Sequence, residues 1–113
     1  MAEPCIFCRI ASGEIPTQMV ANTAEIVAFR DLDPKAPVHI LVIPKQHITS
    51  LDEATDSALL GRMTALAAEI ARSEGISEPG YRTVINTGKD GGQSVDHLHI
   101  HLLGGRPMKW PLG

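Results

Sequence analysis

The stretch Asp96-His97-Leu98-His99-Ile100-His101-Leu102-Leu103, near the C-terminus, alternates polar and apolar residues. Strict alternation is typical of a half-buried β-strand, in which successive side chains point to opposite faces of the sheet. The pattern predicts a strand from Val95 to Leu103, with three imidazoles on one face, about 6.6 Å apart, and the intervening apolar side chains in the core. Such a row could be a metal site, a polar face without function, or a centre for phosphate-transfer chemistry.

Composition sets limits on the class of protein. A chain of 113 residues with 43% hydrophobic and 20% charged residues predicts one soluble globular domain over 1–113. A net charge of −3 without a basic run argues against a non-specific nucleic-acid or membrane-surface binder. Met1–Pro4 carries no secretory signal, and no apolar run reaches membrane-spanning length. We therefore expect a cytoplasmic protein whose Cys5 and Cys8 are reduced.

The remaining patterns predict an α+β domain with a largely antiparallel sheet. The almost continuously apolar stretch Val38–Ile43 is typical of a central strand buried on both faces. Apolar residues at three- and four-residue spacing predict one long helix from about Asp52 to Glu74, which Gly75 would end. A short helix is expected over 5–11, a hairpin over 19–20 and 26–29, and a further strand over 81–87.

The loop Gly88–Ser94 leads directly into the histidine stretch and is rich in glycine. Glycine lets the backbone approach an anion closely, and successive N–H groups can bind a phosphate. A plain turn is the alternative, because the spacing of a P-loop is absent. The position beside the histidines favours a phosphate site, with Ser94 as a hydrogen-bonding group and an imidazole as the nucleophile.

A second group of residues suggests a metal. Cys5 and Cys8 form a C-x-x-C pair, and His47 follows a predicted strand end, so these residues and one more histidine could hold tetrahedral zinc. Two buried reduced cysteines are the alternative. His39 lies within an apolar strand and Asp31 within a loop, and the simplest interpretation makes them a core histidine and a turn residue.

Residues 91–103, Gly-Gly-Gln-Ser-Val-Asp-His-Leu-His-Ile-His-Leu-Leu, resemble the His-x-His-x-His-x-x signature of the histidine triad (HIT) family, in which x is apolar. Segments 31–34 and 36–45 and the ending 110–113 are similar to the branch of histidine triad nucleotide-binding proteins. The resemblance runs from about Cys5 to the last residue. It implies a HIT-like fold with a five-stranded sheet, one long and one short helix, and a homodimer whose two sheets join.

The resemblance also implies an activity. The chain would hydrolyse purine nucleoside 5′-phosphoramidates at the α-phosphorus and release the nucleoside monophosphate. His99 would form a covalent nucleotidyl-histidine, since neutral imidazole is nucleophilic at one nitrogen and leaves phosphorus readily once reprotonated. His101 would contact the phosphate, His39 would support the histidines from the neighbouring strand, and Ser94 would assist the phosphate or the leaving group.

The nucleotide pocket implied by the resemblance combines apolar residues for the base with polar groups for the ribose and phosphate. Asp31 would accept the ribose hydroxyls, and Asn86 with the backbone near Gly92 would position the phosphate. The implied set is Ile6, Phe7, Ile10, Phe29, Asp31, Leu32, Asn86, Gly92, Gln93, Ser94, His99 and His101, of which the first four would enclose the base.

Some members of the family bind zinc through a C-x-x-C pair, the histidine after Pro-Lys-x and the first triad histidine. The matching residues here are Cys5, Cys8, His47 and His97. Members without the cysteines remain active, so the zinc would be structural. Either the metal then lies close behind the active site, or a bulge turns His97 away from His99. Asp96 stands where this branch often has an aromatic residue, which leaves the detail of the substrate open.

Two other functions stay open at this point. One is a dinucleoside polyphosphate hydrolase of a neighbouring branch, although its relatives extend well beyond the triad and only 12 residues follow His101 here. The other is a zinc- or nucleotide-binding regulatory module with incidental hydrolysis. A hydrolase whose metal is held by the three histidines is disfavoured by the adjacent glycine loop and the separate Cys/His set.

Overall fold

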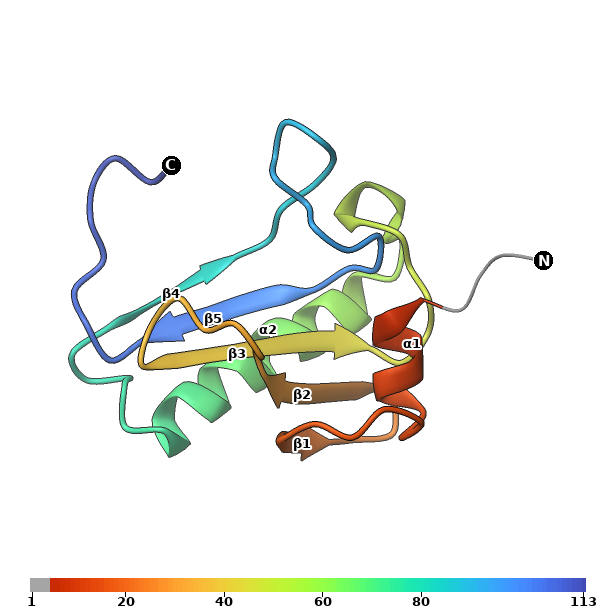
Figure 1. The fold of residues 1–113 in the computed structure, drawn as a ribbon, viewed down its shortest axis with the longest axis horizontal. Coiled ribbons are helices and arrows are strands. Elements are labelled where there is room, and N and C mark those ends of the chain that lie inside the picture. The colour runs from red at the N-terminus through yellow and green to blue at the C-terminus, as the bar shows by residue number, and fades with distance from the viewer. Residues whose placement is uncertain (1–4) are drawn as a thin grey trace.

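The computed structural model describes residues 5–113, so Met1–Pro4, on which the expected absence of a secretory signal rests, lies outside it. Five strands form one antiparallel sheet in the order β1-β2-β3-β5-β4 (Figure 1). The predicted α+β class and antiparallel sheet are confirmed. The elements are α1 (Ile6–Ala11), β1 (Met19–Asn22), β2 (Ile26–Arg30), β3 (Val38–Pro44), a 3₁₀ turn (Leu51–Glu53), α2 (Ser57–Ser73), β4 (Tyr81–Val84) and β5 (Ile100–Gly104).

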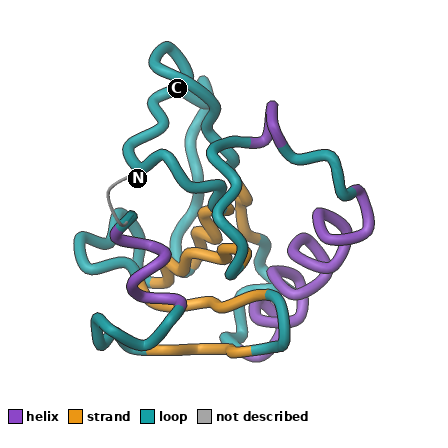
Figure 2. The backbone as a smooth tube through the Cα atoms, turned by 90° about the vertical axis from the view of Figure 1, so that its right-hand side faces the viewer, coloured by secondary structure: helices purple, strands orange, loops and turns teal. Residues whose placement is uncertain are grey.

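The central strand β3 is buried on both faces, as its continuous apolar sequence predicts. Ile40 and Val42 point into a core shared with α2, whereas Leu41 and Ile43 point to the opposite face, where α1 packs. Figure 2 shows the two helices on opposite sides of the strands. Strands covered on both faces need apolar side chains at every position, which explains the loss of alternation in this stretch.

Helix α2 begins five residues later than the sequence predicts, at Ser57 instead of Asp52. The carboxylate of Asp56 accepts a hydrogen bond from the main-chain N–H of Leu59 at 3.1 Å and so caps the helix. The preceding residues Leu51–Glu53 form the separate 3₁₀ turn. Among the described residues, no helix has both the length and the apolar character needed to cross a membrane.

The histidine stretch forms a shorter strand than predicted, because β5 begins at Ile100 and not at Val95. Upstream of Ile100 the backbone leaves the ladder: the N–H of His97 donates to the carbonyl of Val95 at 2.8 Å, and the N–H of Leu98 donates to the carbonyl of Ile48 at 2.7 Å. Strand β4 likewise ends at Val84, short of the predicted Thr87. The apolar residues of the stretch, Leu98, Ile100 and Leu102, still point into the α2 core.

Candidate active site

The three histidines of the stretch lie in different environments. His97 and His99 are buried in the irregular segment before β5, with 0% and 3% of their surface exposed, whereas His101 lies on β5 opposite Leu41. The His99 ring packs edge-on against Phe7 and His101, with centroids 5.1 Å and 4.9 Å away. The predicted row of three equivalent rings is therefore wrong: His99 and His101 stay neighbours, and the bend turns His97 toward other partners.

The proton on His99 is placed by a main-chain carbonyl. Its Nδ1 lies 2.7 Å from the carbonyl oxygen of His97. Because a carbonyl can only accept, Nδ1 carries a proton, so in the neutral form of the ring the lone pair is on Nε2. A buried imidazole held in this tautomer can act as a nucleophile through Nε2.

A chain of hydrogen bonds places the proton of His101 on Nε2, whereas that of His99 is on Nδ1. The main-chain N–H of Lys35 donates to Nδ1 of His39 at 3.0 Å, so the proton of neutral His39 is on Nε2. That Nε2 lies 2.9 Å from Nδ1 of His101 and 3.4 Å from a carboxylate oxygen of Asp31. His101 must therefore accept at Nδ1 and carry its own proton on Nε2.

The Nε2–H of His101 is a hydrogen-bond donor without an acceptor among the described residues. This nitrogen is buried and has no hydrogen-bond partner within residues 5–113. Burial lowers the pKa of His101 to about 4, with smaller contributions from His99 and His39. Burial also lowers the pKa of His39, against the opposing effect of Asp31. Both rings are neutral near pH 7, and the free N–H suits an oxygen of a bound ligand.

The side chain of Gln93 fixes the glycine loop. Its amide Nε2 donates to the carbonyls of Thr49 and Val95 at 2.7 Å and 3.0 Å, and its Oε1 accepts from the N–H of Gly88 at 2.9 Å. A Cβ at Gly91 would overlap the main-chain carbonyl of Thr87, so this position requires glycine. From the sequence, only the backbone around Gly92 and Gln93 is expected to contribute, because nothing in the pattern indicates that the Gln93 side chain has a partner as distant as Thr49.

Two other expected phosphate residues lie in the segment between β4 and β5. Asn86 is half-buried and Ser94 is exposed. Within the described part of the chain, neither side chain donates a hydrogen bond to a histidine ring or accepts one from it. Asp31 follows β2 directly, and besides its contact with His39 it accepts from the N–H of Asp33 at 2.9 Å.

The residues expected to enclose the base divide into two kinds. Phe7, Ile10 and Phe29 are buried in the core beneath α1, and the rings of Phe7 and Phe29 meet edge-to-face at 5.6 Å. Ile6 and Leu32, in contrast, are 48% and 82% exposed. Of the buried three, Phe7 packs against the His99 ring, whereas the exposed two have apolar surface available to a ligand.

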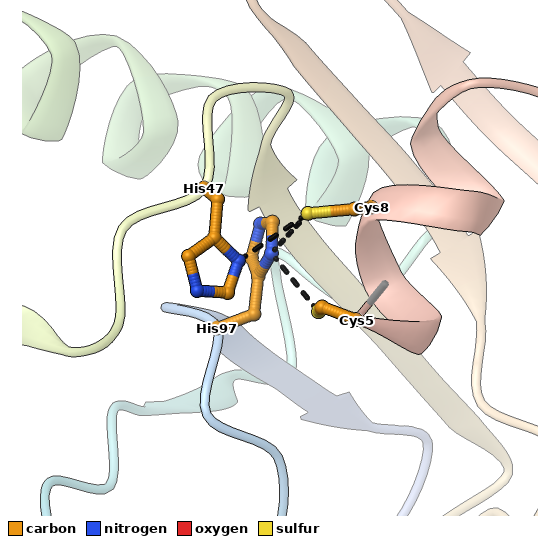
Figure 3. A group of neighbouring side chains, drawn as sticks. All are labelled: Cys5, Cys8, His47 and His97. Carbon is orange, nitrogen blue, oxygen red and sulfur yellow. Dashed lines mark hydrogen bonds between the residues drawn. The ribbon is translucent and has the colours of Figure 1, made fainter. Parts of the chain in front are cut away.

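Cys5, Cys8, His47 and His97 meet between α1, the segment after β3 and the segment before β5 (Figure 3). Their four ligand atoms lie within 4.8 Å of one another. Nδ1 of His97 is 3.4 Å from Sγ of Cys5 and 3.5 Å from Sγ of Cys8, and Nδ1 of His47 is 3.3 Å from Sγ of Cys8. A tetrahedral zinc ion would separate its sulfur and nitrogen ligands by about 3.6 Å. The four residues fit such an ion.

The tautomer of His97 also suits a metal. Its Nε2 lies 2.8 Å from the carbonyl of Pro44, so Nε2 carries the proton and Nδ1 turns a lone pair toward the thiols. Burial and the neighbouring Cys5 raise the pKa of the Cys8 thiol. A cation would reverse that effect, because a coordinated thiol is deprotonated outright.

A second cluster, Asp31, His39 and His101, also brings its potential ligand atoms within 4.8 Å of one another. Here the hydrogen bond from Lys35 occupies Nδ1 of His39 and leaves the proton on Nε2. The nitrogen that faces the cluster then has no lone pair for a metal. We interpret this cluster as a hydrogen-bond network.

A surface cavity of about 540 Å³ lies at the far end of the sheet, where the segment after α2, β4 and the C-terminal tail meet. It contains none of the histidines or cysteines. Its arginines are engaged with main-chain carbonyls, since Arg82 donates to Lys109 at 3.1 Å and Arg106 to Lys35 at 2.9 Å. The chemistry of the side chains therefore points to the histidine face and not to this cavity.

The lowered pKa of His101 predicts that folding stability falls as pH drops from about 6.5 toward about 4. In this range the unfolded chain takes up a proton at this position and the folded chain does not, so stability rises with pH. For this partly exposed ring we expect a loss of about 1 to 2 kcal/mol between pH 7.5 and pH 5. Urea denaturation of wild type and His101→Gln at both pH values measures it. An identical pH dependence in the two proteins would contradict the assignment.

Comparison with known proteins agrees with this geometry. A family model described as the HIT domain matches residues 12–108. An uncharacterised HIT-like protein of Synechococcus elongatus is 56% identical over 115 residues, covering 100% of both chains. The purine nucleoside phosphoramidase of Escherichia coli K12 is 49% identical over 110 residues, covering 96% of this chain and 92% of that protein.

A solved structure shows the same likeness. The crystal structure of a HIT family hydrolase from Legionella pneumophila matches with a TM-score of 0.95 at 50% identity, covering 97% of this chain and 100% of that chain. The resemblance stated from the sequence is confirmed. The chain belongs to the HIT domain family.

Proposed function

We propose that this chain is a nucleotide hydrolase that cleaves the P–N bond of purine nucleoside 5′-phosphoramidates and releases the nucleoside monophosphate. One observation carries the proposal: the hydrogen bond from Nδ1 of His99 to the carbonyl of His97 leaves a lone pair on Nε2, beside the free N–H of His101. Membership of a family with hydrolases, and the name of the Escherichia coli relative, support the reaction class.

The proposed reaction has two steps. In the first, Nε2 of His99 attacks the α-phosphorus, a P–N bond to the ring forms, and the P–N bond of the substrate breaks as the amine leaves with a proton taken from solvent. In the second, water attacks the same phosphorus and returns a proton to solvent, the bond to His99 breaks, and the monophosphate departs. The carbonyl of His97 stabilises the positive charge on the substituted ring, because it accepts the Nδ1–H throughout.

The remaining polar groups would act on the phosphate. The Nε2–H of His101 would donate to a non-bridging oxygen, where negative charge develops in the transition state. Asn86, the backbone at Gly92 and Gln93, and Ser94 would complete the phosphate site, with Ser94 assisting the leaving amine. His39 acts through His101, to which it donates.

The nucleoside would lie against α1 and the loop after β2. Asp31 would accept the ribose hydroxyls with the remaining lone pairs of its carboxylate, whose Oδ1 accepts from the N–H of Asp33 and whose Oδ2 lies 3.4 Å from Nε2 of His39. Exposed Ile6 and Leu32 would contact the purine, and Phe7, Ile10 and Phe29 would support that surface from the core.

We propose that Cys5, Cys8, His47 and His97 hold a structural zinc ion. The ion would cross-link three segments that are distant in the sequence and would take no part in the reaction steps. Thiolate ligands require reduced cysteines, which suits a location in the cytoplasm.

We also propose a homodimer in which the β4 edges of two sheets pair. The β4 edge has no neighbour within the described chain, and Tyr81 and Ile85 are partly exposed along it. In the tail, Trp110 and Leu112 are 80% and 62% exposed. An open edge beside exposed apolar side chains is a surface that a second copy can cover by symmetric pairing.

The nucleophile is tested by His99→Asn. We expect kcat/KM for adenosine 5′-phosphoramidate to fall by at least about a thousandfold, because an amide cannot form the covalent intermediate. Binding of AMP, measured by calorimetry, should persist and shows that the variant is folded. Wild-type turnover in this variant would overturn the covalent mechanism.

The same assay separates the alternative functions. The proposal expects wild type to prefer the phosphoramidate over a dinucleoside polyphosphate. The reverse preference would favour a polyphosphate hydrolase. Nucleotide binding with negligible turnover of both substrates would favour a regulatory module.

Metal content tests the zinc proposal. Protein purified without added zinc should contain about one zinc ion per chain. The Cys8→Ser variant should contain no zinc and should have a lower melting temperature than wild type. Adding a chelator should lower the melting temperature of wild type but not that of the variant. Turnover that persists in the metal-free variant agrees with a structural ion, whereas turnover lost with the metal and restored by it would contradict this role.

Sedimentation equilibrium tests the homodimer. We expect a mass of twice the 12.1 kDa of the chain at micromolar concentration. Thr83→Pro, which places a proline on the proposed β4 edge, should shift the mass toward the monomer. A monomeric wild type at these concentrations would contradict the proposal.

A further inference from the structure

The loop between β2 and β3 presents one main-chain N–H group to the histidine network. The amide of Lys35 points at Nδ1 of His39, with 3.0 Å between the two nitrogens. The side chain of Lys35 turns elsewhere, since it is 63% exposed and its ammonium group pairs with Asp33. The main chain of Lys35, and not its charge, is therefore what His39 contacts.

We infer that the main-chain amide of Lys35 is a positioning group for the proposed reaction, because it determines through His39 which nitrogen of His101 carries the proton. The inference rests on the proposed function, in which that proton faces the phosphate. The Lys35 amide is hydrogen-bonded to His39 and not to His101, so its effect on His101 passes through His39.

The amide makes the hydrogen-bond chain run in one direction. With Lys35 N–H donating to Nδ1 of His39, the Nε2–H of His39 donates to Nδ1 of His101, and the proton of His101 is left on Nε2. The reverse direction would put a proton on Nδ1 of His39, 3.0 Å from the amide nitrogen, so that two donors face each other. Two facing donors leave both hydrogen bonds unmade, which disfavours the reverse direction.

The direction of the hydrogen-bond chain determines which group His101 presents to a ligand. In the forward direction His101 presents an N–H, the group that a phosphate oxygen accepts from. In the reverse direction it would present a lone pair, which repels the same oxygen. Asp31 supports the forward direction, because its carboxylate oxygen lies 3.4 Å from Nε2 of His39 and attracts the proton there.

Hydrogen bonds on both sides of Lys35 hold its amide in place. Arg106, in the segment after β5, donates to the carbonyl of Lys35 at 2.9 Å. Upstream, the N–H of Asp33 donates to the side chain of Asp31 at 2.9 Å and closes the turn. The loop therefore enters the network at a fixed position, with the amide aimed at His39.

A matched pair of variants separates the amide from the side chain. Lys35→Ala removes the ammonium group and keeps the N–H, whereas Lys35→Pro removes the N–H as well. We expect Lys35→Ala to retain kcat/KM within about twofold, and Lys35→Pro to lose about tenfold, as expected when a hydrogen bond to a charged group is lost.

Nitrogen-15 NMR of the histidine rings gives a readout that a purely structural role would not change. In wild type and Lys35→Ala we expect protonated Nε2 and bare Nδ1 in both His39 and His101. In Lys35→Pro the His101 signals should move toward a mixture of the two tautomers. A proline directly after Pro34 can prevent folding. If Lys35→Pro cannot be purified, the wild-type spectrum alone tests which nitrogen of His101 carries the proton.

The outcomes separate this inference from the proposed function. An active wild type whose His101 carries its proton on Nδ1 would overturn the inference and leave the reaction standing. Unchanged His101 tautomers and turnover in folded Lys35→Pro would overturn it too. The expected tautomers in a protein that does not turn over phosphoramidates would support the hydrogen-bond chain and contradict the proposed function.

Discussion

The hydrogen bond between Nδ1 of His99 and the carbonyl of His97 is the constraint on which the site depends. At 2.7 Å it fixes the orientation of a buried ring and, in the neutral form of that ring, places the lone pair on the opposite nitrogen. It forms because the backbone bends out of the sheet before Ile100, where Leu98 bonds to Ile48 instead of to a neighbouring strand. In a regular strand that carbonyl would face a ladder partner or solvent, and the proposed nucleophile would lose its fixed tautomer.

The same device recurs around the site, since a main-chain group orients each buried imidazole. Pro44 accepts from His97, His97 accepts from His99, and Lys35 donates to His39, which in turn orients His101. His97 joins two functions: its ring faces the thiols of the proposed metal site, while its carbonyl holds His99. A metal that fixes His97 would therefore also hold His99, the proposed nucleophile, in place.

Periodicity predicted the elements that bury large apolar faces. The stripe of α2 and the continuous run of β3 were identified because burial alone determines their pattern. Periodicity did not predict where β5 and α2 begin, because single hydrogen bonds to Ile48 and Asp56 determine these positions. The spacing of the histidines did not indicate their separate roles either, because their partners include main-chain atoms of Lys35 and Pro44. Only the family resemblance distinguished the candidate nucleophile from the candidate metal ligand.

The covalent intermediate on His99 is the central claim, and trapping it is the most direct test. Wild-type protein mixed rapidly with a phosphoramidate labelled in its nucleoside is quenched with alkali, which preserves phosphorus–nitrogen bonds to histidine, and is then digested and mapped by mass spectrometry. We predict one nucleoside monophosphoryl group on Nε2 of His99 during turnover. Turnover without label on the protein, or label on another residue in its place, would contradict it.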